Sequence, residues 1–225
     1  MCELVTENHW LHGVGIRVTD YRARLKSIHM SFDAPLDRVC EHTCYIHIVI
    51  DAPNDLEAED EKDNVVFFVD SKAVERKLNG PYYKIFYDER NATIEEIDKW
   101  VRSVVDFFQL MIFRIGMVCV DFAELRTFLS CCDSRTLRFE KILYDDHATV
   151  PFDKSSGHAY RTLYGCLSSR VGILSLGHYT DFADAIEFHN PDLVIAKIGM
   201  TFGDDDPGAM MLLGEPIVPK CPHGK

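Results

Sequence analysis

The stretch Gly116-Met-Val-Cys-Val-Asp-Phe-Ala-Glu-Leu-Arg-Thr127 comes directly after the longest helical pattern in the chain. In that pattern, Thr93 and Glu96 have the spacing of a capping box. Apolar residues then recur at helical spacing, and these are Ile94, Ile97, Val101, Val104, Val105, Phe108, Leu110, Met111 and Ile112. The pattern predicts a helix over 93–113 that is apolar on most of its surface. Such a helix packs between two layers or two subdomains.

Short β-like runs precede this helix, at 13–19, 25–32, 44–50, 64–70 and 82–87. The runs at 45–50 and 65–69 are continuously apolar or nearly so, which is typical of strands buried on both faces of a parallel sheet. Several of the segments between the runs are too short for a full crossover helix. We therefore predict a parallel sheet that lacks some of its helices.

Further elements are predicted after the long helix. Helices are expected at 122–132 and about 157–168, and strands near 137–144, 170–177, 192–200 and 209–213. The acidic turn at 203–208 is interpreted as a solvated hairpin tip, because the alternating ligands and the bidentate Glu of a calcium loop are absent. We expect a reduced parallel-sheet subdomain over 1–92, a central helix over 93–115, and an α+β subdomain over 116–225.

The composition is that of a folded protein. The chain has 225 residues, of which 47% are apolar, and 36 acidic residues outnumber 24 basic ones to give a net charge of −12. The basic residues are scattered, so we expect no nucleic-acid partner. No apolar run long enough for a membrane span and no secretory leader are apparent, which predicts a cytoplasmic protein without membrane insertion. Residues 51–63 hold seven acidic residues and one basic residue, and thus half of the net charge.

The eight cysteines are expected to be reduced in such a compartment. Cys119, Cys131, Cys132 and Cys166 are interpreted as small core residues. The cluster Cys40-Glu41-His42-Thr43-Cys44 and the tail residues Cys221 and His223 do not match a zinc pattern, so no metal is predicted. The isolated His158, His178 and His189 are read as surface or core residues, and no motif of another enzyme class is present.

The stretch 116–127 resembles the loop and following helix of FtsZ, the tubulin-like bacterial division GTPase. The shared residues are Gly116, Val120, Asp121, Phe122, Ala123, Arg126 and Thr127. The similarity extends to a helix and strand at 168–177, to the strand–turn–strand at 199–211, to the strand at 27–36, and to a strand-to-loop turn at 13–15. It implies an α/β fold of the tubulin/FtsZ type, with the apolar helix at its centre.

The resemblance departs from the FtsZ pattern where nucleotide is bound. Phosphate-binding loops need glycines, because backbone amides must approach the phosphate closely. Here Gly13-Val-Gly15 is followed by Ile16 to Asp20, whose β-branched side chains we expect to fill the phosphate space. The second glycine-rich loop of the family is replaced by the acidic residues 51–63, which would repel a triphosphate. The sequence therefore predicts a pseudo-GTPase without cofactor.

The resemblance also implies a contact surface. In FtsZ, the loop equivalent to 116–124 enters the nucleotide site of the next subunit, and Asp121 and Glu124 match its catalytic acids, while Cys119 replaces an Asn. We expect Gly116, Cys119, Asp121, Phe122 and Glu124 to form an interface here, with no catalytic residue. An equally good interpretation is that Asp121 is a helix N-cap and Glu124 its capping-box partner.

Three functions are consistent with this reading. The first is a non-catalytic protein that binds FtsZ or a related filament protein and caps or inhibits the division polymer. The second is a nucleotide-independent scaffold that assembles with itself. The third is a pseudo-GTPase that keeps the fold and binds an unrelated partner. The short tail at 216–225 makes membrane recruitment through the family's usual adaptors doubtful.

Overall fold

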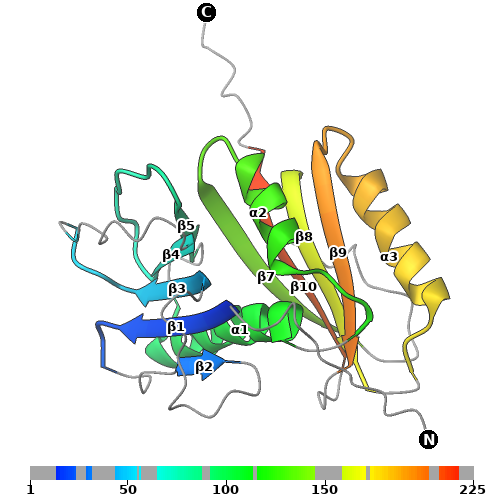
Figure 1. Cartoon of the computed structure of the whole chain (residues 1–225), viewed down its shortest axis with the longest axis horizontal. Coiled ribbons are helices and arrows are strands. Elements are labelled where there is room, and N and C mark those ends of the chain that lie inside the picture. The colour runs from blue at the N-terminus through cyan, green and yellow to red at the C-terminus, as the bar shows by residue number, and fades with distance from the viewer. Residues whose placement is uncertain are drawn as a thin grey trace, which may run out of the picture.

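The computed structural model describes residues 14–23, 29–31, 44–54, 56, 65–87, 92–113, 116–144, 159–170, 173–202 and 208–217. Its strands form one ten-stranded sheet in the order β2-β1-β3-β4-β5-β7-β10-β8-β9-β6 (Figure 1). The first half of the chain supplies one side of this sheet and the second half supplies the other. The α/β class expected from the sequence is confirmed.

The strands of the first half run parallel, as their apolar runs predicted. They are β1 (Val14–Asp20), β3 (Cys44–Ile50), β4 (Val65–Asp70) and β5 (Tyr82–Phe86), and β2 (His29–Ser31) lies antiparallel at the edge. No helix connects β4 to β5, because residues 71–81 cross in an extended segment. The predicted loss of a crossover helix is therefore confirmed at this connection.

The second half continues the same sheet. β5 pairs in parallel with β7 (Thr136–Tyr144), and β10 (Gly208–Pro216) lies antiparallel between β7 and β8 (Tyr160–Ser169). β9 (Ile195–Phe202) pairs in parallel with β8, and the short β6 (Gly116–Val118) pairs with the far end of β9. The division of the chain into two subdomains, with boundaries at residues 92/93 and 115/116 on either side of the central helix, stays a prediction.

The long helix α1 (Ile94–Phe113) has the predicted bounds within one residue. Thr93 N donates to Glu96 Oε2 at 2.7 Å, and Glu96 N donates to Thr93 Oγ1 at 3.3 Å, which completes the expected capping box. Two adjacent residues of α1 contact strands of opposite halves. The ring of Phe108 lies 4.6 Å from that of Phe67 on β4, and Phe107 lies 5.4 Å from Phe139 on β7.

Two further helices cover the second half of the sheet on opposite faces. α2 (Phe122–Ser130) shares the α1 face, where Leu125 and Phe128 join the main core. α3 (Leu176–His189) packs Phe182 and Ile186 into a second core on the other face. In the first half, that other face is covered by a small apolar cluster that includes Val66, Phe68 and Leu78.

Two predicted elements are wrong. A helix was expected at 157–168, but residues 160–168 belong to β8. A strand was expected at 170–177, but the described residues 173–175 lead into α3, which begins at Leu176. Almost every residue of β8 is buried, so its sequence lacks the alternation that distinguishes a strand from a buried helix. In α3 only Phe182 and Ile186 are buried, which leaves a weak helical pattern.

Several predictions fall outside the described residues. They concern the turn at 203–207, the side chains of the Cys40–Cys44 cluster, His158, and the tail cysteine and histidine. Of the helices that can be described, none combines the length and the apolarity needed to cross a membrane.

Gly214 gives a test of how tightly the centre of the sheet is packed. A Cβ atom at this position on β10 would lie 2.6 Å from the Thr162 carbonyl oxygen and 2.5 Å from the Tyr160 ring. We expect Gly214→Ala to lower the free energy of unfolding by about 2 kcal/mol or more, as overpacked cores do. Gly177→Ala in α3 is the control, because its Cβ would meet only Ser175 Oγ at 3.4 Å. Urea denaturation measures both, and equal stabilities would contradict the packing argument.

Candidate functional site

The loop that leads into α2 is held against the sheet at Gly116. A Cβ atom here would lie 2.0 Å from the Met200 carbonyl oxygen, so only glycine allows β6 to approach β9 this closely. Cys119 is exposed, and its Sγ atom lies 3.4 Å from both the amide nitrogen and the carbonyl oxygen of Gly116. The expectation that Cys119 is a core residue is therefore wrong. Cys132 and Cys166 are buried as predicted, and Cys131 is half-buried.

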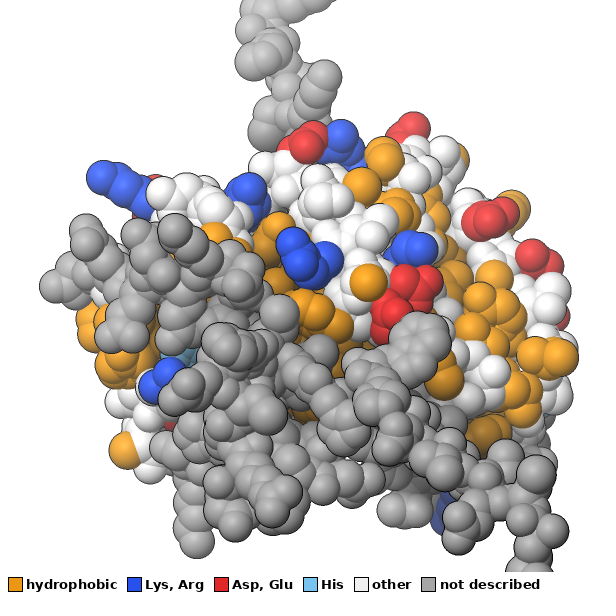
Figure 2. Space-filling view, viewed as in Figure 1, with side chains coloured by type: hydrophobic (Ala, Val, Ile, Leu, Met, Phe, Trp, Pro, Cys, Tyr) orange, Lys and Arg blue, Asp and Glu red, His pale blue; other side chains and the backbone are white. Residues whose placement is uncertain are grey.

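Asp121 and Glu124 form the capping box of α2. Asp121 Oδ1 accepts a hydrogen bond from Glu124 N at 2.8 Å, and Asp121 N donates to Glu124 Oε2 at 3.2 Å. The second Glu124 oxygen lies 3.3 Å from Lys197 Nζ on β9. In the space-filling view, acidic side chains lie beside a basic one on the face that carries α2 (Figure 2). The helix-cap interpretation of these two acids is thus confirmed, and it leaves an interface role open.

The residues predicted as an interface lie together in this loop. Asp121 and Cys119 are exposed, Gly116 and Glu124 are partly exposed, and Phe122 packs partly against the main core. The buried Val120 fixes the loop between them. The result is a short, ordered, mostly polar surface next to an edge of the sheet, and one of its carboxylates is already neutralised by Lys197.

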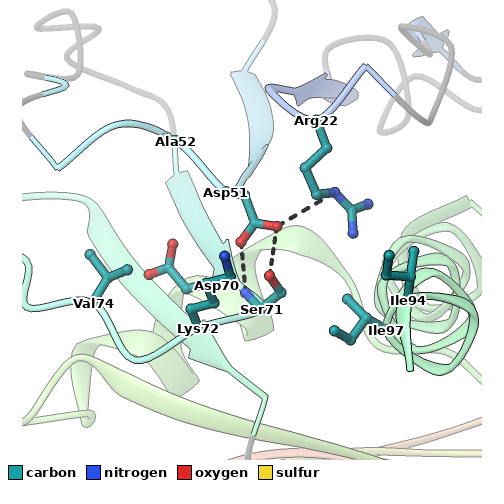
Figure 3. Close-up of a pocket in the computed structure, with 9 residues that line it drawn as sticks. All are labelled: Arg22, Asp51, Ala52, Asp70, Ser71, Lys72, Val74, Ile94 and Ile97. Atoms are coloured by element: carbon teal, nitrogen blue, oxygen red, sulfur yellow. Dashed lines mark hydrogen bonds and ion pairs between the residues drawn. The ribbon is translucent and has the colours of Figure 1, made fainter. Parts of the chain in front are cut away.

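A second candidate site lies where the parallel strands of the first half end. In open α/β sheets, ligands bind at the carboxyl ends of the strands. Asp20 ends β1, Asp51 follows β3, Asp70 ends β4, and the first turns of α1 close the site from the side (Figure 3). Asp51 follows one buried apolar run and Asp70 ends another, and this is the signal by which the sequence could have indicated the site.

The turn that the resemblance placed at 13–15 is elsewhere. Gly15 lies inside β1, paired with Tyr45 of β3 and Ser31 of β2, and the strand continues to Asp20. Ile16 is 1% exposed in the sheet interior under α1, so it does not fill a phosphate space at the strand end. The turn at the site is Tyr21 to Ala23, in which Ala23 has a φ of 56° and no glycine occurs.

Arg22 joins carboxylates from separate elements across the site. Its Nε lies 3.0 Å from Asp20 Oδ1 and 3.5 Å from Asp51 Oδ2, and its Nη1 lies 3.0 Å from Asp98 Oδ1 on α1. The arginine side chain is 15% exposed and that of Asp20 is 1% exposed. Because the ion pairs are largely removed from water, they are stronger than surface pairs. Arg22 thereby connects the ends of β1 and β3 to the central helix.

The backbone amides at the strand ends are also occupied. Arg22 N donates to Asp20 Oδ1 at 2.9 Å, and Ser71 N donates to Asp51 Oδ1 at 2.7 Å, with Ser71 Oγ on the other Asp51 oxygen at 2.7 Å. Free amides at this edge are the groups that bind phosphate in such folds. Here the protein's own carboxylates take these two positions.

Asp70 is bound in the same manner by Arg76 from the extended segment 71–81. Arg76 Nη2 and Nε lie 2.6 and 2.8 Å from the two Asp70 oxygens, and Nη2 also donates to the Ala52 carbonyl oxygen at 2.9 Å. Asp70 is 0% exposed, and the guanidinium lies 4.4 Å above the Phe68 ring. Removing either partner would leave an uncompensated buried charge, which is strongly destabilising.

The buried thiols and His178 have structural surroundings. Burial raises the pKa of the Cys132 and Cys166 thiols to about 12, so both remain protonated and unreactive at neutral pH. His178 is the capping-box partner of Ser175 at the start of α3. Over the described ranges, no three His, Cys, Asp or Glu side chains are arranged as metal ligands.

Replacing Arg22 tests whether the ion-pair network maintains the site. We expect Arg22→Leu to lower the free energy of unfolding by about 2 to 3 kcal/mol at pH 7, because Asp20, Asp51 and Asp98 lose their shared cation. The control is Arg17→Leu, which removes an exposed arginine from β1, the strand that precedes Arg22. A loss of stability of equal size in both variants would contradict this role.

Comparisons with known proteins establish the fold. No protein-family model matches the sequence, and a search of curated proteins also gives no match. The solved structures that resemble the chain include TubZ-Bt in a helical model of its two-stranded filament, at 14% identity and a TM-score of 0.52 over 79% of this chain and 60% of that one. A GTPγS-form protofilament of TubZ from Bacillus thuringiensis serovar israelensis is 12% identical, with a TM-score of 0.51 over 79% of this chain and 61% of that one. CetZ from Methanosaeta thermophila is 10% identical, with a TM-score of 0.50 over 70% of this chain and 54% of that one.

The chain thus spans less than two thirds of the length of each of these structures. At such identities the likeness concerns the fold alone. The order of helices and strands, the central α1 and the single long sheet are the features that the described residues contribute to it. The protein has the fold of the tubulin/FtsZ superfamily.

Proposed function

We propose that this chain is a non-catalytic FtsZ-like protein that binds FtsZ or a related filament protein and caps or inhibits its assembly. The observation that carries the proposal is the Arg22 network at the strand ends. The site where a nucleotide would be expected holds Asp20, Asp51 and Asp98 around one arginine, and its turn has no glycine. This supports a pseudo-GTPase.

Electrostatics argue against a triphosphate in this site. To use the two amides at the strand ends, a phosphate would have to displace the carboxylates of Asp20 and Asp51, which would then lie beside it. Like charges at such distances repel by a few kcal/mol in a partly buried site. Moving these carboxylates away would cost free energy, because it would break the ion pair of Asp20 with Arg22 and the hydrogen bond of Asp51 with Ser71.

The loop 116–124 is the surface that we propose contacts the filament protein. The loop 116–124 is ordered by Gly116 and by the capping box, and it exposes Asp121 and Cys119. The TubZ relatives were solved as protofilaments and as a two-stranded filament, which supports longitudinal contacts as the kind of interaction to test. A subunit that offers the loop surface and lacks the nucleotide would end a filament rather than extend it.

Two experiments test the proposal directly. Calorimetric titration with GTP should show no binding, and micromolar affinity would overturn the loss of the nucleotide site. Co-sedimentation with FtsZ and GTP should show less polymer and slower GTP turnover when this protein is present at equimolar concentration. Unchanged polymer mass and turnover would exclude capping, and polymer formed by this protein alone would favour the self-assembling scaffold.

The loop is tested by a variant that removes charge while keeping the helix cap. Asp121→Asn with Glu124→Gln retains groups able to form both capping hydrogen bonds, so the fold should be unaffected. We expect this double variant to lose most of the inhibition of FtsZ assembly. The matched control is Asp184→Asn with Glu187→Gln, which removes two exposed carboxylates from α3. Full inhibition by the loop variant would show that Asp121 and Glu124 are not part of the contact.

A further inference from the structure

The site at the strand ends retains an open pocket beside the ion-pair network. Its volume is about 370 Å³, which lies in the range of small-molecule sites. The ends of β3 and β4 form one side of the pocket, and the start of α1 forms the other, with Ile94 and Ile97 facing the strand ends (Figure 3). Val74 from the extended segment 71–81 adds a further aliphatic wall.

The apolar side of the pocket is open to solvent. Ile94 is 58% exposed, whereas the buried residues of the same helix begin only at Val101. The next two residues of α1, Glu95 and Glu96, are both exposed as well, so no side chain of this first turn covers Ile94. A ligand with an apolar body would bury Ile94, Ile97 and Val74 together, and that burial would favour binding.

The charged groups that line the pocket differ in whether they already have hydrogen-bond or ion-pair partners. Each Asp51 oxygen accepts a hydrogen bond from Ser71, and each Asp70 oxygen accepts one from Arg76. Arg22 is bound to its three carboxylates. Lys72 also lines the pocket, and within the described part of the chain its ammonium group makes no hydrogen bond or ion pair. Among the described residues that line the pocket, the charge without a partner is therefore a single positive one, on Lys72.

We propose that this pocket binds a small amphipathic monocarboxylate, with its carboxylate on Lys72 and its apolar body against Ile94, Ile97 and Val74. One negative charge matches one available ammonium group, whereas a polyphosphate would also meet Asp51 and Asp70. Asp51 and Asp70, the described carboxylates that line the pocket, both have partners already and offer less to a cationic ligand. The inference rests on the proposed loss of nucleotide binding, and it does not depend on any protein partner.

The experiment uses octanoate as the probe and the full chain as the protein. Isothermal titration calorimetry should show saturable binding of octanoate to one site. Octylammonium, with the same chain and the opposite charge, should bind at least about fivefold more weakly, as expected for one exposed ion pair. GTP is titrated separately. Binding of GTP in place of octanoate would overturn the loss of the nucleotide site, whereas binding of neither would overturn this inference alone.

Three variants locate the site. Lys72→Gln should weaken octanoate about fivefold and leave the neutral octanamide unchanged. Ile94→Asp should abolish binding of both, and because Ile94 is largely exposed the variant is expected to fold, which circular dichroism checks. The control Lys77→Gln removes another exposed lysine of the segment 71–81, one that does not line the pocket, and should not alter binding. Octanoate binding that is unchanged in Lys72→Gln and Ile94→Asp, or octylammonium binding that equals octanoate, would overturn the proposal.

Discussion

The packing of α1 against both halves of the sheet is the constraint on which the rest of the molecule depends. Phe107 and Phe108 are neighbours in sequence and are both fully buried, yet one contacts β7 and β8 while the other contacts β4. A single helical turn therefore joins the two sets of strands through aromatic contacts. Because aromatic side chains bury large apolar areas, neither half could leave this helix without exposing much of the core.

The sequence predicted most of the elements and misjudged two. The helix over 93–113 was predictable because its capping box and its apolar spacing agree, and β3 and β4 because continuous apolar runs of that length are typical of parallel strands. β8 and α3 were not predictable, because β8 is buried on both faces and α3 buries few residues. Periodicity carries little information in either case.

The site was only partly predictable, for a different reason. The capping residues Asp121 and Glu124 act on their own helix, so their roles follow from local spacing. Arg22, Asp51 and Asp98 are distant in sequence and meet only once the strand order is known. The resemblance to FtsZ placed a strand-to-loop turn at 13–15, whereas strand β1 continues from Val14 to Asp20 and the turn follows it.

The continuous sheet has a mechanical consequence. β5 and β7 are paired over Lys84 to Phe86, and Lys84 N donates to the Arg135 carbonyl oxygen at 2.9 Å. Backbone hydrogen bonds thus join the two halves edge to edge, in addition to the contacts that each makes with α1. A hinge rotation between the halves would have to break the backbone hydrogen bonds between β5 and β7 and expose their amide and carbonyl groups. The molecule is therefore built to hold one shape, and to unfold as a single cooperative unit.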